Sequence, residues 1–251
     1  MNAPCISPDW PAPANIIALT TLRRGGESLP PYGSFNLAAH VGDDDSAVLA
    51  NRARLSRLLP PGTHVHWLTQ VHGTEVANAA VASVGTVADA SWSRTPGSAC
   101  AVLTADCLPV LFCSREGDVV AAAHAGWRGL LEGVLENTVA AMGRDPRLIM
   151  AWLGPAIGPA AFEVGAEVRA AFLQAARTRQ RAQTDACFVP SEARPGHYLA
   201  DLYALARLRL AALGPEGVFG GGFCTFAEDD RFFSYRRDGR TGRMASVILL
   251  R

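Results

Sequence analysis

Short, dense apolar runs alternate along the chain with stretches in which apolar residues recur at helical spacing. The runs AVLTADCLPVLFC and DVVAAAHA are separated only by SREG, which predicts two neighbouring buried strands joined by a tight turn. Cys107 and His124 are then expected near the ends or bends of these strands. Further strands are predicted in LIMAWLGPAIG, which Gly and Pro break, and in VFGGGFCT and MASVILL.

Helical periodicity predicts four longer helices. The first begins near Ser46, and the second covers LLEGVLENTVAAMG and ends at Gly143. The third covers FEVGAEVRAAFLQAA, with Glu163 and Glu167 early in it. The fourth, YLADLYALARLRLAALG, is amphipathic and stops at Gly214.

The order of these elements favours a mixed architecture over a sandwich or a bundle. Residues 176–196 are polar and mixed, and they predict a surface connection. We find no repeat, no low-complexity segment and no linker long enough to divide the chain. We therefore predict one α/β or α+β domain over residues 1–251, built of mixed β-sheets with helices packed outside.

Composition limits the classes of partner. The 251 residues include 23 basic and 23 acidic side chains, and only 18% of the chain is charged. No net field attracts the protein to nucleic acid or to an anionic membrane. We expect a small substrate, no nucleic-acid partner and no membrane partner, and a monomer or small homo-oligomer.

Cysteine usage and the N-terminus indicate the compartment. The six cysteines, at positions 5, 100, 107, 113, 187 and 224, include no CxxC pair and no regular spacing. This argues against a disulfide framework or a closed Cys₄ zinc site and is typical of reduced thiols. The N-terminus lacks a basic segment followed by a long apolar one, and no run approaches about 20 apolar residues. We expect a soluble, cytoplasmic protein.

His72, Cys107 and His124 are the main candidates for chemistry. They stand in the blocks QVHGTEV, TADCLPVLF and AAAHAGWRGL, each at the edge of an apolar run. One thiolate and two imidazoles would form a zinc site with its fourth tetrahedral position open to water or substrate. Taken singly, His72 is equally consistent with a surface turn, and Cys107 with a small buried residue.

Charged residues beside these candidates strengthen the case for a site. Asp106 adjoins Cys107 within an apolar strand pair and needs a partner to offset its desolvation, so it is a candidate substrate contact. Arg128 precedes a helix, so its guanidinium and the first-turn N–H groups could hold a phosphate or carboxylate. The alternative is a salt bridge from Arg128 to Asp106 or Glu132.

Polar loops supply weaker candidates. Asn36 and Arg52 could bind substrate, or they could serve as a helix cap and a solvated helix face. Residues 154–159 alternate Gly and Pro, which suits either close approach to a ligand or simply a rigid loop. Near the C-terminus, Arg237 is interpreted as an exposed charge on an edge strand, and the role of Arg236 is left open.

Seven blocks follow one another in order from about residue 33 to the C-terminus: GSFNLAAHVGDD, NRARL, QVHGTEV, TADCLPVLF, AAAHAGWRG, LGPAIGPAAFEVG and FFSYRRDGRTGRMASVI. Together they resemble the family variously called laccase-domain, multicopper polyphenol oxidase or purine nucleoside phosphorylase proteins, which also includes a peptidoglycan editing factor. Residues 1–30 match it only loosely. The resemblance implies a mixed α/β fold, metal ligation by His72, Cys107 and His124, and substrate or phosphate contacts from Asn36 and Arg52.

The resemblance also implies activity on purine nucleosides. The expected reactions are phosphorolysis of adenosine, inosine, guanosine or methylthioadenosine, and deamination of adenosine. Phosphorolysis requires an anion held near an oxocarbenium-like centre, which suits Arg52 or Arg128. Deamination requires water activated by a metal, which can lower the pKa of water from 15.7 to about 7. Purine nucleoside and phosphate are therefore the expected partners, and zinc the expected cofactor.

Three alternatives stay open. Copper is compatible with two histidines and one cysteine, but a multicopper cluster needs many imidazoles and the chain has six histidines. A second enzyme class is an amidase or hydrolase acting on a peptidoglycan precursor, with Cys107 as nucleophile or with a zinc-activated water. The third alternative is a structural or sensing metal domain that binds a partner through its basic C-terminal segment.

Overall fold

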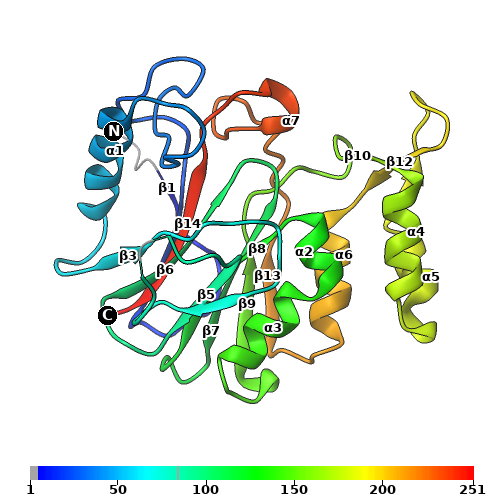
Figure 1. Ribbon diagram of the computed structural model, residues 1–251. Coiled ribbons are helices and arrows are strands. Elements are labelled where there is room, and N and C mark those ends of the chain that lie inside the picture. The colour runs from blue at the N-terminus through cyan, green and yellow to red at the C-terminus, as the bar shows by residue number, and fades with distance from the viewer. Residues whose placement is uncertain (1–4, 84) are drawn as a thin grey trace.

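Two large sheets lie face to face and carry helices on their outer surfaces (Figure 1). The computed structural model describes residues 5–83 and 85–251. A five-stranded sheet has the order β1 (Cys5–Ile6), β2 (Ile16–Thr21), β14 (Met244–Leu250), β6 (Ser98–Thr104) and β3 (His64–His66). A six-stranded sheet has the order β13 (Gly217–Gly220), β9 (Ile149–Leu153), β7 (Leu108–Ser114), β8 (Val120–Ala125), β5 (Ala90–Ser93) and β4 (Val76–Asn78). Both sheets mix parallel and antiparallel pairs.

The helices cover the outer faces. Against the five-stranded sheet lies α1 (Asp45–Ser56), and against the six-stranded sheet lie α2 (Trp127–Glu132), α3 (Val134–Ala141) and α6 (Leu202–Ala211). A small antiparallel sheet of β10 (Glu163–Gly165), β12 (His197–Ala200) and β11 (Phe188–Pro190) stands at one side with α4 (Ala166–Ala175) and α5 (Arg181–Asp185). The short elements are α7 (Tyr235–Asp238), η1 (Pro146–Leu148) and η2 (Thr178–Gln180). This arrangement confirms the predicted class of mixed sheets with helices outside.

Side chains along the strands of the six-stranded sheet alternate between two cores, one beneath the helices and one between the two sheets. In β8, Ala121, Ala123 and Ala125 face the helices, whereas Val120 and Ala122 face the other sheet. His124 continues this second series, so the period of the strand directs its imidazole toward the space between the sheets. Because both faces of β7 and β8 are buried, these strands are apolar throughout, which explains the unbroken runs in the sequence.

The run AVLTADCLPVLFC is not the single strand that its composition predicts. It forms β6 and β7, which belong to different sheets, and the chain crosses between the sheets at residues 105–107. Asp106 occupies the left-handed region with φ of 92°. The expected position of Cys107 at a bend is confirmed, and so is the antiparallel pairing of β7 with β8.

Several boundaries differ from those predicted. The helix over LLEGVLENTVAAMG is interrupted at Gly133, whose φ of 104° ends α2 and begins α3. Glu163 lies in β10, because the third helix begins only at Ala166. The fourth helix begins at Leu202, after β12. The surface connection 176–196 contains η2, α5 and β11.

Other predictions agree with the structure. The helix near Ser46 is α1, and MASVILL is β14 over its full length. Arg237 does not lie on an edge strand: it belongs to α7, and its guanidinium donates to the carbonyls of Thr225, Phe226 and Phe232. Within residues 5–83 and 85–251, none of the helices has the length and apolar character needed to cross a membrane.

Candidate metal centre

The fold brings His72, Cys107 and His124 together. His72 comes from the loop between β3 and β4, Cys107 from the crossing between the sheets, and His124 from the end of β8. One nitrogen or sulfur atom from each lies within 4.8 Å of the others, and Cys107 Sγ is 3.8 Å from His72 Nε2. The two imidazole rings meet edge to face, with centroids 4.8 Å apart. Residues separated by up to 52 positions (124 − 72) therefore present three soft or borderline donors to one point.

Asp89 orients the side chain of His124 and fixes the loop that carries His72. This carboxylate is fully buried just before β5, and its Oδ1 is 2.8 Å from Nδ1 of His124. The backbone N–H groups of Val71, His72 and Gly73 also donate to it, at 2.7 to 3.0 Å. With Nδ1 donating to Asp89, Nε2 is the nitrogen of His124 that faces the centre and would bind a metal ion once deprotonated. One carboxylate thus orients a ligand and fixes the loop that carries another.

The turn that carries Cys107 is held by Asp106. Oδ1 of Asp106 accepts from the Thr225 hydroxyl at 2.6 Å, and Oδ2 accepts from the backbone N–H of Arg236 at 2.6 Å. The carbonyl of Asp106 accepts from the N–H of Ile157 at 2.9 Å, within the Gly- and Pro-rich loop. These bonds offset the desolvation of the carboxylate and support its unusual backbone conformation.

Gly126 leaves the space that the ligands need. A Cβ atom at this position would lie 2.8 Å from Cδ2 of His72 and 3.1 Å from Sγ of Cys107. Zinc at 2.0 to 2.3 Å from tetrahedral N and S donors would separate those donors by about 3.3 to 3.6 Å, close to the 3.8 Å found between Cys107 and His72. The donor types, their spacing, this glycine cradle and the carboxylate behind His124 all fit a bound metal ion.

The three side chains also shift one another's protonation. Burial opposes ionisation of the Cys107 thiol, but His124 and His72 outweigh it and lower the pKa of Cys107 to about 6. Burial likewise opposes the charged form of His124, but Cys107 and Asp89 outweigh it and raise the pKa of His124 to about 9. At pH 7 the metal-free centre therefore pairs a Cys107 thiolate, the form of cysteine that binds metals, with a His124 imidazolium, and metal binding would release the imidazolium proton.

The centre lies on the wall of an open cavity of about 380 Å³. Its other lining residues include His40, Gln70, Tyr235 and Arg243. Gln70 pairs with both backbone groups of Leu103, which ties the His72 loop to the end of β6. His72 is exposed and Cys107 half-buried, so a molecule in the cavity can reach the donor atoms.

Arg243 is the main cationic group of this cavity. Its Nη1 donates to the carbonyls of Thr241 and Gly242, and its guanidinium lies 5.8 Å from the centroid of the Tyr235 ring. Among the described residues, its Nε and Nη2 make no hydrogen bond. Burial lowers the pKa of Arg243, and the nearby Cys107 and Asp106 oppose that shift. An anionic substrate group placed here would meet free guanidinium N–H groups.

The sequence of this chain matches a known family over most of its length. The family described as multi-copper polyphenol oxidoreductase laccase matches residues 17–251. The chain belongs to this laccase family. Two similar relatives are named purine nucleoside phosphorylase: one from Pseudomonas aeruginosa is 55% identical over 250 residues, covering 100% of this chain and 99% of the relative. The other, YfiH of Escherichia coli, is 53% identical over 246 residues and covers 98% of each chain.

Solved structures of similar proteins share the fold. Protein NMB0706 of Neisseria meningitidis superposes with a TM-score of 0.91 at 52% identity, over 99% of both chains. YlmD from Geobacillus stearothermophilus has a TM-score of 0.88 at 32% identity, over 100% of this chain and 97% of that one. The resemblance that the seven sequence blocks indicated is confirmed.

The other residues that the laccase-family resemblance or the sequence singled out lie outside this cavity wall. Asn36 is fully buried, and its amide ties Ala38, Asp43 and Arg243 together through hydrogen bonds. Arg52 donates to the carbonyl of Leu37 and stacks on Trp67, in a separate hollow. Asn36 therefore helps to position the backbone of Arg243 on the cavity wall.

Arg128 is exposed, and its guanidinium lies 4.4 Å from the centroid of the Trp127 ring. The alternative salt bridges from Arg128 to Asp106 or Glu132 are absent from the part of the chain that the structure describes. Both carboxylate oxygens of Asp106 instead accept hydrogen bonds, one from the Thr225 hydroxyl and one from the backbone N–H of Arg236. Arg236 directs its side chain to the carbonyl of Glu163.

Sequence reasoning missed Asp89 and Arg243. Asp89 interrupts the small apolar segment Val-Ala-Asp-Ala-Ser-Trp, and a carboxylate in such a segment signals a buried polar contact. Arg243 stands directly before the last apolar strand, within a block quoted for the family resemblance. Neither signal identifies the partner, because the partners lie far along the chain.

Proposed function

We propose that this protein is a zinc-dependent purine nucleoside phosphorylase that also deaminates adenosine. The observation that carries the proposal is one cavity that combines His72, Cys107 and His124 with the free guanidinium N–H groups of Arg243. The names of the two similar relatives support the substrate class, which is a purine nucleoside with phosphate as co-substrate. The metal, the deamination and the individual nucleosides belong to the proposal.

Each residue of the cavity has its own role in the proposed reaction. His72, Cys107 and His124 hold the metal ion, and a bound zinc ion supplies Lewis acidity and lowers the pKa of water to about 7. Asp89 accepts from Nδ1 of His124, which leaves Nε2 as the nitrogen that faces the metal. Arg243, with His40 beside it on the cavity wall, holds the phosphate while the glycosidic bond weakens and positive charge develops on the ribose. Arg52, Arg128, Asn36 and Asp106 remain predicted substrate contacts.

Zinc is favoured over a set of copper ions by the number of available ligands. In residues 5–83 and 85–251, His72, Cys107 and His124 form the one group of three or more His, Cys, Asp or Glu side chains able to hold a metal ion. A cluster of several coppers requires more imidazoles than this group provides.

The proposal is tested with purified protein loaded with one equivalent of zinc. Adenosine with phosphate should yield adenine and ribose 1-phosphate, and adenosine alone should yield inosine. His72→Ala should lose both activities and bound zinc, whereas His64→Ala, an exposed histidine of β3 outside the cavity, should keep them. Undiminished turnover by zinc-free His72→Ala, or no turnover of any purine nucleoside by the loaded protein, would rule the proposal out.

A second candidate function rests on the series Asp89, His124 and Cys107. A carboxylate that orients an imidazole beside a thiol of lowered pKa is the arrangement of a cysteine nucleophile. In this version the protein is an amidase or hydrolase acting on a peptidoglycan precursor. It predicts activity in the presence of a chelator and an acyl adduct on Cys107, detectable by mass spectrometry. Loss of the activity on chelation would remove it, because one thiolate cannot serve both roles.

A further inference from the structure

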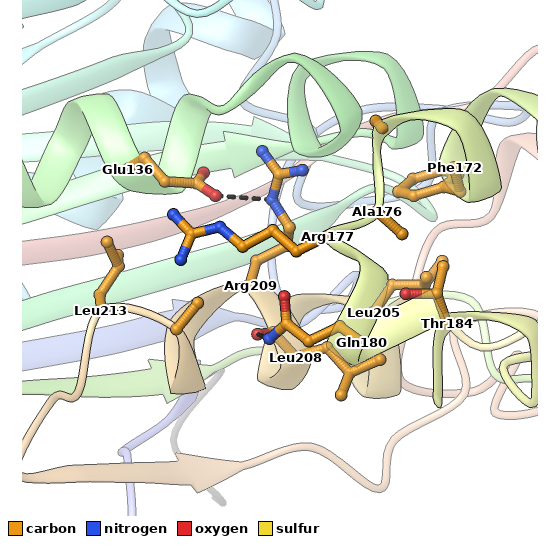
Figure 2. Close-up of a pocket in the computed structure, with 12 residues that line it drawn as sticks. Glu136, Phe172, Ala176, Arg177, Gln180, Thr184, Leu205, Leu208, Arg209 and Leu213 are labelled. Carbon is orange, nitrogen blue, oxygen red and sulfur yellow. Dashed lines mark hydrogen bonds and ion pairs between the residues drawn. The ribbon is translucent and has the colours of Figure 1, made fainter. Parts of the chain in front are cut away.

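A second cavity lies on the opposite side of the six-stranded sheet, among α3, α4, α5 and α6. It encloses about 310 Å³ and shares no lining residue with the cavity of the metal centre. Figure 2 shows its lining side chains, which come from α3 at one edge, from the segment after α4 and from α6. It is therefore a separate site, and nothing in the proposed chemistry uses it.

Two arginines supply its polar edge. Nε of Arg209 donates to Oε1 of Glu136 at 2.6 Å, which orients the guanidinium of Arg209 beside the cavity. Arg177 comes from the segment between α4 and η2, and Figure 2 shows its guanidinium extended toward Glu136. Within the described residues, the Arg177 side chain makes no hydrogen bond or ion pair, and the Nη atoms of Arg209 make no hydrogen bond. Two guanidinium groups against one carboxylate leave a net positive charge.

The remaining wall is largely apolar. Phe172, Leu205, Leu208 and Leu213 line it, and the amide of Gln180 is held by the carbonyl of Leu208 at 3.2 Å. Phe172 and Leu205 belong to the buried core, so this wall is firm. Small-molecule sites have this character, with apolar walls and a few oriented polar groups, and a volume of 310 Å³ suits a small ligand.

We propose that this cavity binds a small oxyanion, a carboxylate or a phosphate ester, attached to a compact apolar group. Arg177 and Arg209 offer paired N–H donors to the oxyanion, the geometry in which guanidinium groups bind carboxylate and phosphate. The ring of Phe172 and the leucines of α6 and the following segment contact the apolar group. Glu136 contributes by orienting Arg209.

The test is a titration of the full-length protein followed by ¹H–¹⁵N NMR, with four probes. Isocaproate and phenyl phosphate present the two oxyanions, isocaproamide is the uncharged match of isocaproate, and inorganic phosphate lacks the apolar group. At least one of the first two should shift amide signals of α3, α4 and α6 with a Kd below about 1 mM. Isocaproamide should bind at least about tenfold more weakly than isocaproate, because it lacks the negative charge. Inorganic phosphate should bind at least about tenfold more weakly than phenyl phosphate, because it lacks the apolar group.

Variants assign the binding to the arginines. Arg177→Gln should weaken the Kd by about tenfold, and the pair Arg209→Gln with Glu136→Gln should do the same without leaving a carboxylate unpaired. Arg179→Gln is the matched control, because Arg179 is exposed, two residues away and outside the lining. An unchanged Kd in Arg177→Gln, equal binding of the amide, or no saturation by either oxyanion at about 10 mM would overturn the proposal. None of these outcomes depends on nucleoside turnover, so the inference fails or stands separately from the proposed function.

Discussion

Asp89 and His124 share a hydrogen bond of 2.8 Å between Oδ1 of a fully buried carboxylate and Nδ1 of a buried imidazole. Asp89 also accepts three backbone N–H groups from the loop of His72. Burial alone would raise the pKa of Asp89, yet His124 and these N–H groups lower it, so the carboxylate stays charged. The Asp89 carboxylate therefore already supplies a negative charge that would stabilise a metal cation at Nε2 of His124.

Asp89→Asn should weaken zinc binding by about 10- to 100-fold, the range typical for loss of a carboxylate behind a metal-bound histidine. The amide keeps the shape but loses the charge, and its NH₂ group faces two of the N–H donors, because each oxygen of Asp89 accepts from two of them. Zinc affinity is measured by competition with a chromophoric chelator. Asp118→Asn, in an ion pair with Arg144 at the β7–β8 turn, serves as control. Equal zinc affinity in the two variants would contradict this role.

Gly126→Ala should abolish or strongly reduce zinc binding, because the added Cβ would stand 2.8 Å from the His72 ring and 3.1 Å from the Cys107 sulfur. Both ligands must move, and misplaced donors no longer match a tetrahedral ion. The measurement is the metal content of protein purified in the presence of zinc, with circular dichroism to verify the fold. Stoichiometric zinc in a folded Gly126→Ala protein would show that the cradle is wider than the geometry indicates.

The grouping of the three candidate ligands could be predicted from sequence because each stands in a distinctive block beside an apolar run. The crossing at residues 105–107 could not, since Leu108, Val110 and Phe112 on one strand and Cys100 and Val102 on the other are equally apolar. Composition reports burial, but it does not report which of two stacked sheets a residue belongs to.

Other errors arose where backbone conformation overrides periodicity. The apolar spacing of residues 130–142 continues through Gly133, but a left-handed φ of 104° divides the helix there. Arg52 and Arg128 stack on Trp67 and Trp127, outside the lining of the metal cavity, and their contacts with phosphate stay predictions. Arg243 reaches the metal cavity because β14 pairs with β6, a relationship of distant segments.

Asp106→Ala should lower the free energy of unfolding by about 2 to 4 kcal/mol, because the buried Thr225 hydroxyl and the N–H of Arg236 both lose a charged acceptor. Asp106→Asn should cost less, since the Thr225 hydroxyl can accept from the new amide while the remaining oxygen accepts from Arg236. Urea denaturation of the metal-free protein measures both. Asp230→Ala, at an exposed position, is the control. A ranking with Asn costlier than Ala would refute this reading of the turn.

Arg243→Gln should raise the KM for phosphate by about tenfold or more and change the KM for the nucleoside much less, because charge-assisted bonds to an oxyanion are lost. Steady-state kinetics with each substrate varied in turn gives both values. Arg52→Gln is measured alongside it. A comparable rise in its KM for phosphate would assign the phosphate contact to Arg52, the arginine that the sequence predicted. Arg54→Gln, whose side chain lies 4.0 Å from Glu27 on the exposed side of α1, should behave as wild type.

Iodoacetamide should modify Cys107 of the metal-free protein at pH 7 well before Cys5, Cys100, Cys113 and Cys187. The imidazoles lower the pKa of Cys107 to about 6 against the opposing effect of burial, whereas burial raises the pKa of Cys100 and Cys113 to about 12 and of Cys187 to about 11. Burial also raises the pKa of Cys5. Since the thiolate is the nucleophile, the rate at Cys107 should be near its plateau at pH 7 and fall as the pH drops through about 6. Peptide mass spectrometry measures each site. One equivalent of zinc should protect Cys107, and alkylation of Cys107 at the same rate with and without zinc would exclude its sulfur as a ligand.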